Sequence, residues 1–202
     1  MKSQHQIVLS IGSNQGNRLE NIESCIALIH QEVGTVIQVS KLYETPAWGF
    51  ESDAFYNCAL LLHSTSSAQK ILNQVLKVEK QLGRVRSSQQ GYQSRIIDVD
   101  LIVFDDEIID SEKLQVPHPL MQNRKFVLMP MQDLKLNWKH PIFHKTIAEL
   151  IAITPDDSVC KVVQDLKNLL QEIPLQKFNY IAFEGNIGAG KTTLVNKIAE
   201  DF

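Results

Sequence analysis

The hydrophobic and polar positions of the first 33 residues predict a strand followed by a helix. The run IVLSIG, residues 7–12, is apolar enough for a strand, and apolar residues then recur every three to four positions over residues 19–33. Asn17 and Glu20 have the spacing of a capping box at the start of that helix. The chain is therefore expected to open with a strand, a loop and an amphipathic helix.

The same pattern continues through the next seventy residues. Strands are predicted at residues 35–46, 54–63 and 95–104, and a helix at residues 66–82 lies between the last two. The order β-α-β-β-α-β is that of the ferredoxin-like arrangement, in which a mostly antiparallel sheet carries its helices on one face. We therefore expect an α+β fold whose other sheet face is free for ligands.

After this core the pattern predicts further C-terminal helices. Residues 116–126 read as a loop, TIAELI at residues 146–151 as a short helix, and residues 157–173 as an amphipathic helix that Pro174 ends. The chain is accordingly divided into a first domain, a connector helix with its linker, and the start of a second domain, at residues 1–155, 156–177 and 178–202.

Composition narrows the possible partners. Twenty basic and 23 acidic residues give a net charge of −3 without basic blocks, which does not favour nucleic acid or an anionic membrane. The isolated cysteines Cys25, Cys58 and Cys160 read as buried free thiols, and no apolar stretch approaches the roughly 20 residues of a membrane span. We expect a cytoplasmic protein with small-molecule ligands and a monomeric first domain.

Two carboxylates are the first candidate for chemistry. Asp98 and Asp100 are two residues apart on a predicted strand, so their side chains share one face about 6 to 7 Å apart. Because their neighbours are apolar, the two charges repel and resist desolvation unless one is protonated or cations bind between them. Magnesium bridging nucleotide phosphates fits these oxygen ligands. The alternative is an exposed polar face of an edge strand.

Arginines strengthen the case for a phosphate ligand. Arg84, Arg86, Arg95 and Arg124 lie close in sequence to the carboxylates or to the loop after them. Guanidinium groups there would hold a polyphosphate and neutralise charge on a transferred group, whereas a solvated basic loop is the alternative. Glu79 falls within the apolar arc of its helix, so it needs an arginine or a nucleotide hydroxyl as a partner unless it extends to the surface.

Aromatic and amide side chains suggest a site for a flat heterocycle. Phe55 and Asn57 share one strand face, and Phe126 is a candidate for a second ring. Stacked rings with an amide at the edge hold such a ligand, although aromatic residues on a strand more often belong to the core. His118 lies between two prolines and reads either as a phosphate ligand or as a loop residue.

Six stretches taken in order resemble a known family. They are LSIGSNQGN, YETPAWG, FYNCAL, VEKQLGRVR, RIIDVDLIVF and VPHPLMQNRKFVLMPM. At these separations they resemble the 6-hydroxymethyl-7,8-dihydropterin pyrophosphokinases of the folate pathway, over roughly residues 5 to 155. The resemblance implies that the pterin hydroxyl attacks the β-phosphorus of ATP in line, which gives the pterin diphosphate and AMP.

The resemblance also implies roles for individual residues. The two expected magnesium ions would be held by Asp98 and Asp100. The residues that would bind the pterin are Thr45, Pro46, Trp48, Phe55, Asn57 and Phe126. Those that would bind ATP are Glu79, Arg86, Arg95, His118 and Arg124. The catalytic residues would be Arg84, Arg95, Asp98 and Asp100. The chain departs from the family at QQGYQSR, residues 89–95, which lacks a frequent Arg-Trp-Gly-Pro run, and at Pro119, where an aromatic residue is frequent.

The end of the chain carries a separate motif. YIAFEGNIGAGKTTL has the spacing of a phosphate-binding loop, with its characteristic positions at Gly185, Gly190, Lys191 and Thr192. It resembles the opening strand and P-loop of deoxynucleoside kinases, which suggests a truncated second domain of a longer fusion. Two other functions therefore stay open: a nucleoside kinase half in the tail, and a first domain that binds pterin and nucleotide with weakened turnover.

Overall fold

An antiparallel sheet forms the centre of the fold. The computed structural model describes residues 4–47, 52–85 and 94–166. The order across the sheet is β5 (Asp98–Phe104), β1 (His5–Ser13), β4 (Phe55–Ser64), β3 (Lys41–Thr45) and β8 (Lys161–Asp165), and β2 (Thr35–Val39) also pairs with β4. All of these pairs are antiparallel, so the predicted mostly antiparallel α+β fold is confirmed.

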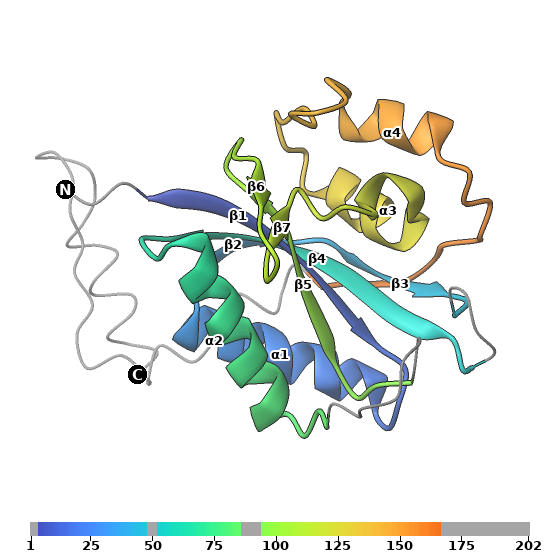
Figure 1. The fold of residues 1–202 in the computed structure, drawn as a ribbon. Helices are drawn as coiled ribbons and strands as arrows, with labels where there is room; N and C mark the ends of the chain where they lie inside the picture. Colours follow the sequence, from blue (N-terminus) through green and yellow to red (C-terminus); the bar gives the residue numbers. More distant parts are fainter. Residues whose placement is uncertain (1–3, 48–51, 86–93, 167–202) are drawn as a thin grey trace, which may run out of the picture. The chain divides into compact units, whose positions relative to one another are not determined.

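Helices lie on both faces of this sheet (Figure 1). On one face are α1 (Arg18–Glu32) and α2 (Ala68–Gln81), and on the other are α3 (Lys125–Asp133) and α4 (Ile147–Ile153). The smaller elements are β6 (Ile109–Asp110), β7 (Gln115–Val116) and the 3₁₀ turn η1 (Met121–Asn123). The two helices of the predicted core, α1 and α2, do share one face, whereas α3 and α4 cover part of the face that was expected to be free for ligands.

The two-residue repeat of β1 separates two hydrophobic cores. Ile7, Leu9 and Ile11 pack in the core beneath α1 and α2, whereas Val8 packs in the core beneath α3 and α4. Successive side chains of a strand point to opposite faces. Ser10 and Gly12 therefore share the face of Val8, beyond the part that α3 and α4 cover.

Helix α1 begins where the sequence predicts. The Asn17 side chain accepts a hydrogen bond from the Glu20 backbone N–H, and Ile22, Cys25, Ile26 and Ile29 are buried. An N-cap of this kind satisfies one of the backbone donors that a helix start leaves without an intrahelical partner.

Three differences from the predicted elements have physical causes. The strand expected at residues 35–46 is interrupted at Ser40, whose backbone N–H and hydroxyl both bond to Ala59. Helix α3 lies in a stretch with no predicted helix, since Pro130 in its interior argues against one. The connector helix predicted over residues 157–173 is wrong at residues 161–165, which form β8.

Strand β8 forms because its backbone pairs with the N–H and C=O groups on the outer edge of β3. Lys41 pairs with Asp165 and Glu44 with Lys161. Without that partner the outward backbone groups of β3 would form an unpaired sheet edge, so tertiary pairing outweighs the helical spacing of the valines. The sheet therefore extends beyond residue 155. Within the described part of the chain, no helix is long and apolar enough to cross a membrane.

Candidate active site

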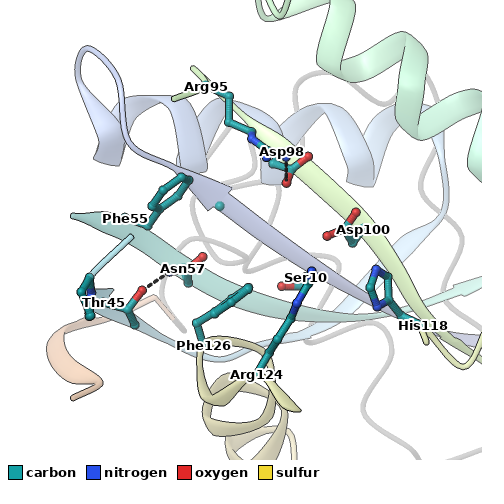
Figure 2. Close-up of a pocket in the computed structure, with 12 residues that line it drawn as sticks. Ser10, Thr45, Phe55, Asn57, Arg95, Asp98, Asp100, His118, Arg124 and Phe126 are labelled. Carbon is teal, nitrogen blue, oxygen red and sulfur yellow. Dashed lines mark hydrogen bonds and ion pairs between the residues drawn. The ribbon is translucent and has the colours of Figure 1, made fainter. Parts of the chain in front are cut away.

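A cavity of about 230 Å³ opens on the sheet face that α3 and α4 leave uncovered. Its lining comes from β1, β3, β4, β5 and the segments around η1 and α3, and consists of Ser10, Gly12, Thr45, Pro46, Phe55, Asn57, Arg95, Asp98, Asp100, His118, Arg124 and Phe126. Figure 2 shows Asp98 and Asp100 on one strand, with Phe55, Asn57 and Phe126 across the cavity from them. One side is thus acidic and the other aromatic.

The strand register sets the distance between these two sides. Gly12 is paired with Asp98 on β5 and with Asn57 on β4, so the three residues form a row across the sheet. A Cβ atom at Gly12 would lie 2.9 Å from Asn57 Oδ1 and 3.6 Å from Phe55 Cδ1. The absence of a side chain at position 12 therefore leaves the Asn57 amide its place in the cavity.

Arginines bracket the Asp98 carboxylate. Arg84 bonds to one of its oxygens and Arg95 to the other, and Arg84 bonds as well to Glu79. Glu79 is 1% exposed, and its Oε1 also accepts the Val99 backbone N–H at 2.9 Å. The partner that the buried carboxylate of Glu79 needs is therefore Arg84. Through its bonds to Arg84 and to the Val99 N–H, Glu79 links Arg84 and the start of β5 to α2.

Asp100 lies in a different electrostatic environment. Burial and the neighbouring Asp98 charge raise the pKa of Asp100 to about 7, against the lowering effect of Arg124 and Arg95. A carboxylate at that position keeps its negative charge at the cost of desolvation and repulsion. A cation between the two aspartates would relieve both, so the donor chemistry of the pair fits a metal ion.

A bulge in β5 helps to place His118. Val8 pairs with Val103 and Leu9 with Leu101, so Ile102 is an extra residue in the ladder. Its carbonyl accepts the His118 backbone N–H at 3.0 Å. The His118 Nδ1 accepts the Leu120 N–H at 3.2 Å. In the neutral ring the proton is therefore on Nε2, which can donate to a ligand.

Burial and the nearby Arg124 lower the pKa of His118 to about 4. Arg124 is 7% exposed and lies over the Phe126 ring, 5.6 Å from the guanidinium carbon to the centroid. The buried Asn57 side chain donates to Thr45 Oγ1 at 2.8 Å, which fixes the amide plane. The cavity therefore combines cationic donors at its acidic side with a fixed amide and two rings at the other.

Comparison with known proteins identifies this arrangement. Residues 8–136 match the model of the 7,8-dihydro-6-hydroxymethylpterin-pyrophosphokinase (HPPK) family. The chain belongs to the HPPK family. Every described residue of the cavity lining falls within the matched range, and membership makes the chain an ATP-dependent diphosphotransferase.

Relatives in several organisms support this assignment. The chain is 35% identical over 144 residues to the 2-amino-4-hydroxy-6-hydroxymethyldihydropteridine pyrophosphokinase of Aquifex aeolicus, covering 71% of this chain and 88% of that protein. It is 37% identical over 138 residues to the enzyme of the same name from Porphyromonas gingivalis, covering 67% and 93%. It is also 34% identical over 141 residues to the folic acid synthesis protein FOL1 of Dictyostelium discoideum, covering 69% of this chain and 21% of that protein.

Solved HPPK-DHPS structures share the fold. The wild-type Plasmodium falciparum protein with STZ-DHP superposes with a TM-score of 0.60 at 16% identity, covering 74% of this chain and 43% of that one. The same protein with pterin and p-hydroxybenzoate gives a TM-score of 0.59 at 16% identity, covering 74% and 42%. At this identity the likeness concerns the fold alone.

Most residues that the HPPK resemblance implicates meet at the cavity. Those that line it are Thr45, Pro46, Phe55, Asn57, Arg95, Asp98, Asp100, His118, Arg124 and Phe126. Arg84 and Glu79 lie behind Asp98 and do not line the cavity, so the predicted contact of Glu79 with ATP stays a prediction.

Some predicted residues fall outside the described part of the chain, and two cavity residues were not predicted. Trp48, Arg86 and the four P-loop positions at Gly185, Gly190, Lys191 and Thr192 lie outside the described residues. Ser10 and Gly12 line the cavity although the sequence did not single them out. In the sequence, only their position in the LSIGSNQGN stretch pointed to a site, because a serine or a glycine alone does not indicate a particular chemistry.

Proposed function

We propose that this chain transfers the pyrophosphoryl group of ATP to the hydroxymethyl group of 6-hydroxymethyl-7,8-dihydropterin, giving the pterin diphosphate and AMP in folate synthesis. The observation that carries the proposal is the single cavity that joins the Asp98 and Asp100 pair to Phe55, Asn57 and Phe126. A polyphosphate needs the first side, and a flat heterocycle needs the second.

On the pterin side, the rings of Phe55 and Phe126 would stack on the heterocycle, and Asn57, held by Thr45, would read its edge. Trp48 and Pro46 would complete this part of the site. In this two-sided arrangement the hydroxymethyl group would point towards the aspartates. Because Thr45 already fixes the amide, little conformational freedom would be lost on binding.

On the nucleotide side, Arg95, Arg124 and His118 would contact the phosphates, with Arg86 as a further ligand. Fixed guanidinium groups neutralise the charge that develops as the β-phosphorus is attacked, and most of the catalysis would come from positioning and charge neutralisation. Neutral His118 would donate through Nε2. Glu79 would act through Arg84, by holding that guanidinium beside Asp98.

Asp98 and Asp100 would hold two magnesium ions. Two carboxylates that share a strand face and repel each other have the oxygen chemistry that this metal prefers. The chemistry that magnesium would supply there is positive charge, which would offset the negative charge of the two aspartates and of the phosphates. Arg84 and Arg95 bond to Asp98, and these guanidinium groups would be free to turn to the phosphates once a cation balanced Asp98.

The experiment that tests the proposal is separation of the nucleotide products by chromatography. The chain is mixed with the dihydropterin, ATP and magnesium, and AMP that forms only with pterin present is the expected result. Asp98→Ala should abolish it and leave the circular dichroism spectrum unchanged. If ADP formed instead, or if Asp98→Ala retained full activity, the proposed reaction or its metal ligands would be wrong.

The P-loop spacing of the tail favours a second candidate, a nucleoside kinase activity in a domain that begins near residue 178. Lys191→Ala and Asp98→Ala separate the two candidates. We expect Lys191→Ala to leave AMP formation at the wild-type rate, because Lys191 lies outside residues 8–136, which match the HPPK family. Loss of AMP formation in Lys191→Ala would assign the reaction to the tail. A chain that binds both ligands without product would instead be a pterin- and nucleotide-binding module.

A further inference from the structure

Asn14 is buried where two segments of the cavity wall meet. It follows β1 directly and is 3% exposed. One segment, residues 52–53, leads into the start of β4 with Phe55. The other, residues 94–95, leads into the start of β5 with Asp98. Neither the family resemblance nor the cavity lining gives Asn14 a role.

The backbone and the side-chain oxygen of Asn14 bind the second segment. The Arg95 N–H donates to Asn14 Oδ1 at 2.7 Å, and the Asn14 N–H donates to the Arg95 carbonyl at 3.1 Å. Because a backbone N–H can only donate, this contact fixes which end of the amide carries the oxygen. Arg95 is thereby held at its main chain while its guanidinium reaches Asp98.

The side-chain nitrogen of Asn14 binds the first segment and completes the link. Nδ2 donates to Ser52 Oγ at 2.9 Å and to the Asp53 carbonyl at 3.4 Å, and it also reaches Ser94 Oγ at 3.1 Å. The hydroxyls of Ser52 and Ser94 contact each other as well. One amide therefore bonds to both sides of the junction.

The neighbouring links made by Arg18, Ser13 and Asn21 hold only one side each. Arg18 donates to the Ala54 carbonyl at 2.7 Å, on the side that leads to Phe55. Ser13 Oγ and Asn21 Nδ2 donate to the Ile96 carbonyl at 2.5 and 3.2 Å, on the side that leads to Asp98. Besides the contact between the Ser52 and Ser94 hydroxyls, the Asn14 amide is the described side chain among these that joins the two sides, and it does so by bonds to main-chain atoms of both, the Asp53 carbonyl and the Arg95 N–H.

We infer that Asn14 is a positioning residue that couples the pterin side of the cavity to the nucleotide side. The inference rests on the proposed function. Ordering of Arg95 by a bound nucleotide would be passed through the Asn14 amide to Ser52 and Asp53, and from there to Phe55. Coupling of this kind is reciprocal, so pterin binding would favour the nucleotide-bound position of Arg95 to the same degree.

The coupling is measured as a ratio of pterin affinities. The fluorescent ligand 6-hydroxymethylpterin is titrated into the 202-residue chain with and without α,β-methylene-ATP and magnesium. We expect the nucleotide to tighten pterin binding in the wild type, and Asn14→Ala to reduce that ratio by about fivefold or more. Pterin affinity without nucleotide should change much less. Asn73→Ala, the same change at an exposed position on α2, is the matched control and should keep the wild-type ratio.

Ser52→Ala keeps the test decisive if Asn14→Ala fails to fold. It removes a single hydrogen-bond partner of the amide at an exposed residue, and we expect it to lower the ratio by about twofold. An unchanged ratio in a folded Asn14→Ala, or in Ser52→Ala when the former does not fold, overturns the inference. The inference is also overturned if the pterin affinity of the wild type is the same with and without the nucleotide. If AMP still forms in such a chain, only the coupling is wrong; if AMP never forms, the proposed function itself fails.

Discussion

Gly12 lies so close to Asn57 that a Cβ atom on the glycine would be 2.9 Å from the amide oxygen. We expect Gly12→Ala to push Asn57 out of the plane that its bond to Thr45 defines. The KM for pterin should rise about tenfold, because one lost polar contact and a crowded pocket each weaken binding. The KM for ATP should stay within about twofold of the wild-type value.

A second glycine supplies the control for this prediction. Gly16 has a φ of +63°, and a Cβ atom added there would have no neighbour within 4 Å, so Gly16→Ala strains the backbone without touching the cavity. It should cost about 1 kcal/mol of unfolding free energy and leave the pterin KM unchanged. If Gly12→Ala also left the pterin KM unchanged, Asn57 would not be the residue that reads the pterin edge.

Asp98 and Asp100 should respond oppositely to the same substitution in metal-free protein. Asp98 is paired with Arg84 and Arg95, so Asp98→Asn leaves guanidinium charge uncompensated and should lower stability by about 1 to 2 kcal/mol. Burial and Asp98 raise the pKa of Asp100, so its charge is costly, and Asp100→Asn should raise stability by about 1 kcal/mol. Both should abolish AMP formation. Urea unfolding in a chelator measures the difference, and changes of equal sign would contradict this account of the pair.

Glu79→Gln tests whether a buried carboxylate positions Arg84. The amide oxygen can still accept the Val99 N–H, but the charge that pairs with Arg84 is gone. We expect kcat to fall about tenfold, because Glu79 would no longer hold the Arg84 guanidinium beside Asp98. Glu32→Gln, which removes a carboxylate bonded to Lys77 on the other side of α2, is the control. If the two variants had equal kcat values, the position of Arg84 would not depend on the charge of Glu79.

His118 should make stability depend on pH in mildly acidic solution. Burial and Arg124 lower its pKa from 6.5 to about 4. Between these values the unfolded chain takes up a proton that the folded chain does not, so the free energy of unfolding falls as the pH falls from 6.5 to 4. The loss should be about 1 to 2 kcal/mol, allowing for the partly exposed ring.

His118→Gln should flatten this part of the stability curve. The comparison uses urea unfolding at a series of pH values, and His144→Asn is the matched control because His144 is exposed and does not line the cavity. The His144 variant should keep the wild-type slope. A His118 variant with the wild-type slope would show that other groups account for the acid sensitivity.

Side-chain periodicity made part of the site predictable. Asp98 and Asp100 share a face because a strand repeats every two residues, and the same rule places Phe55 with Asn57. The importance of Gly12 could not be read in this way, since it comes from the distance to Asn57 across two paired strands. The partner of Glu79 was foreseen as an arginine or a nucleotide, and only the folded chain distinguishes them.

Elements outside the sheet core depended on tertiary contacts. Val159, Val162 and Val163 fit a helical spacing, and the open edge of β3 decides that the last two belong to a strand. Helix α3 carries Pro130, which local rules read as a breaker, yet its buried apolar residues pack enough surface against the sheet to hold the helix. Local propensity is too weak to predict either outcome.

Ile102, the extra residue in β5, differs from the other residues of that strand in what its deletion would do to the pairing with β1. Deleting Val99, for example, would shift Asp98 by one position relative to β1. The Asp98 side chain would then point to the opposite face of the sheet, towards the core beneath α1 and α2. Removing Ile102 would instead restore an unbroken ladder with both faces in phase. What would disappear is the carbonyl that holds His118, together with the buried Ile102 side chain in the core beneath α3 and α4. The pairing of the strands does not require Ile102, which adds to β5 a side chain buried in the core beneath α3 and α4 and a carbonyl that holds the neighbouring loop at His118.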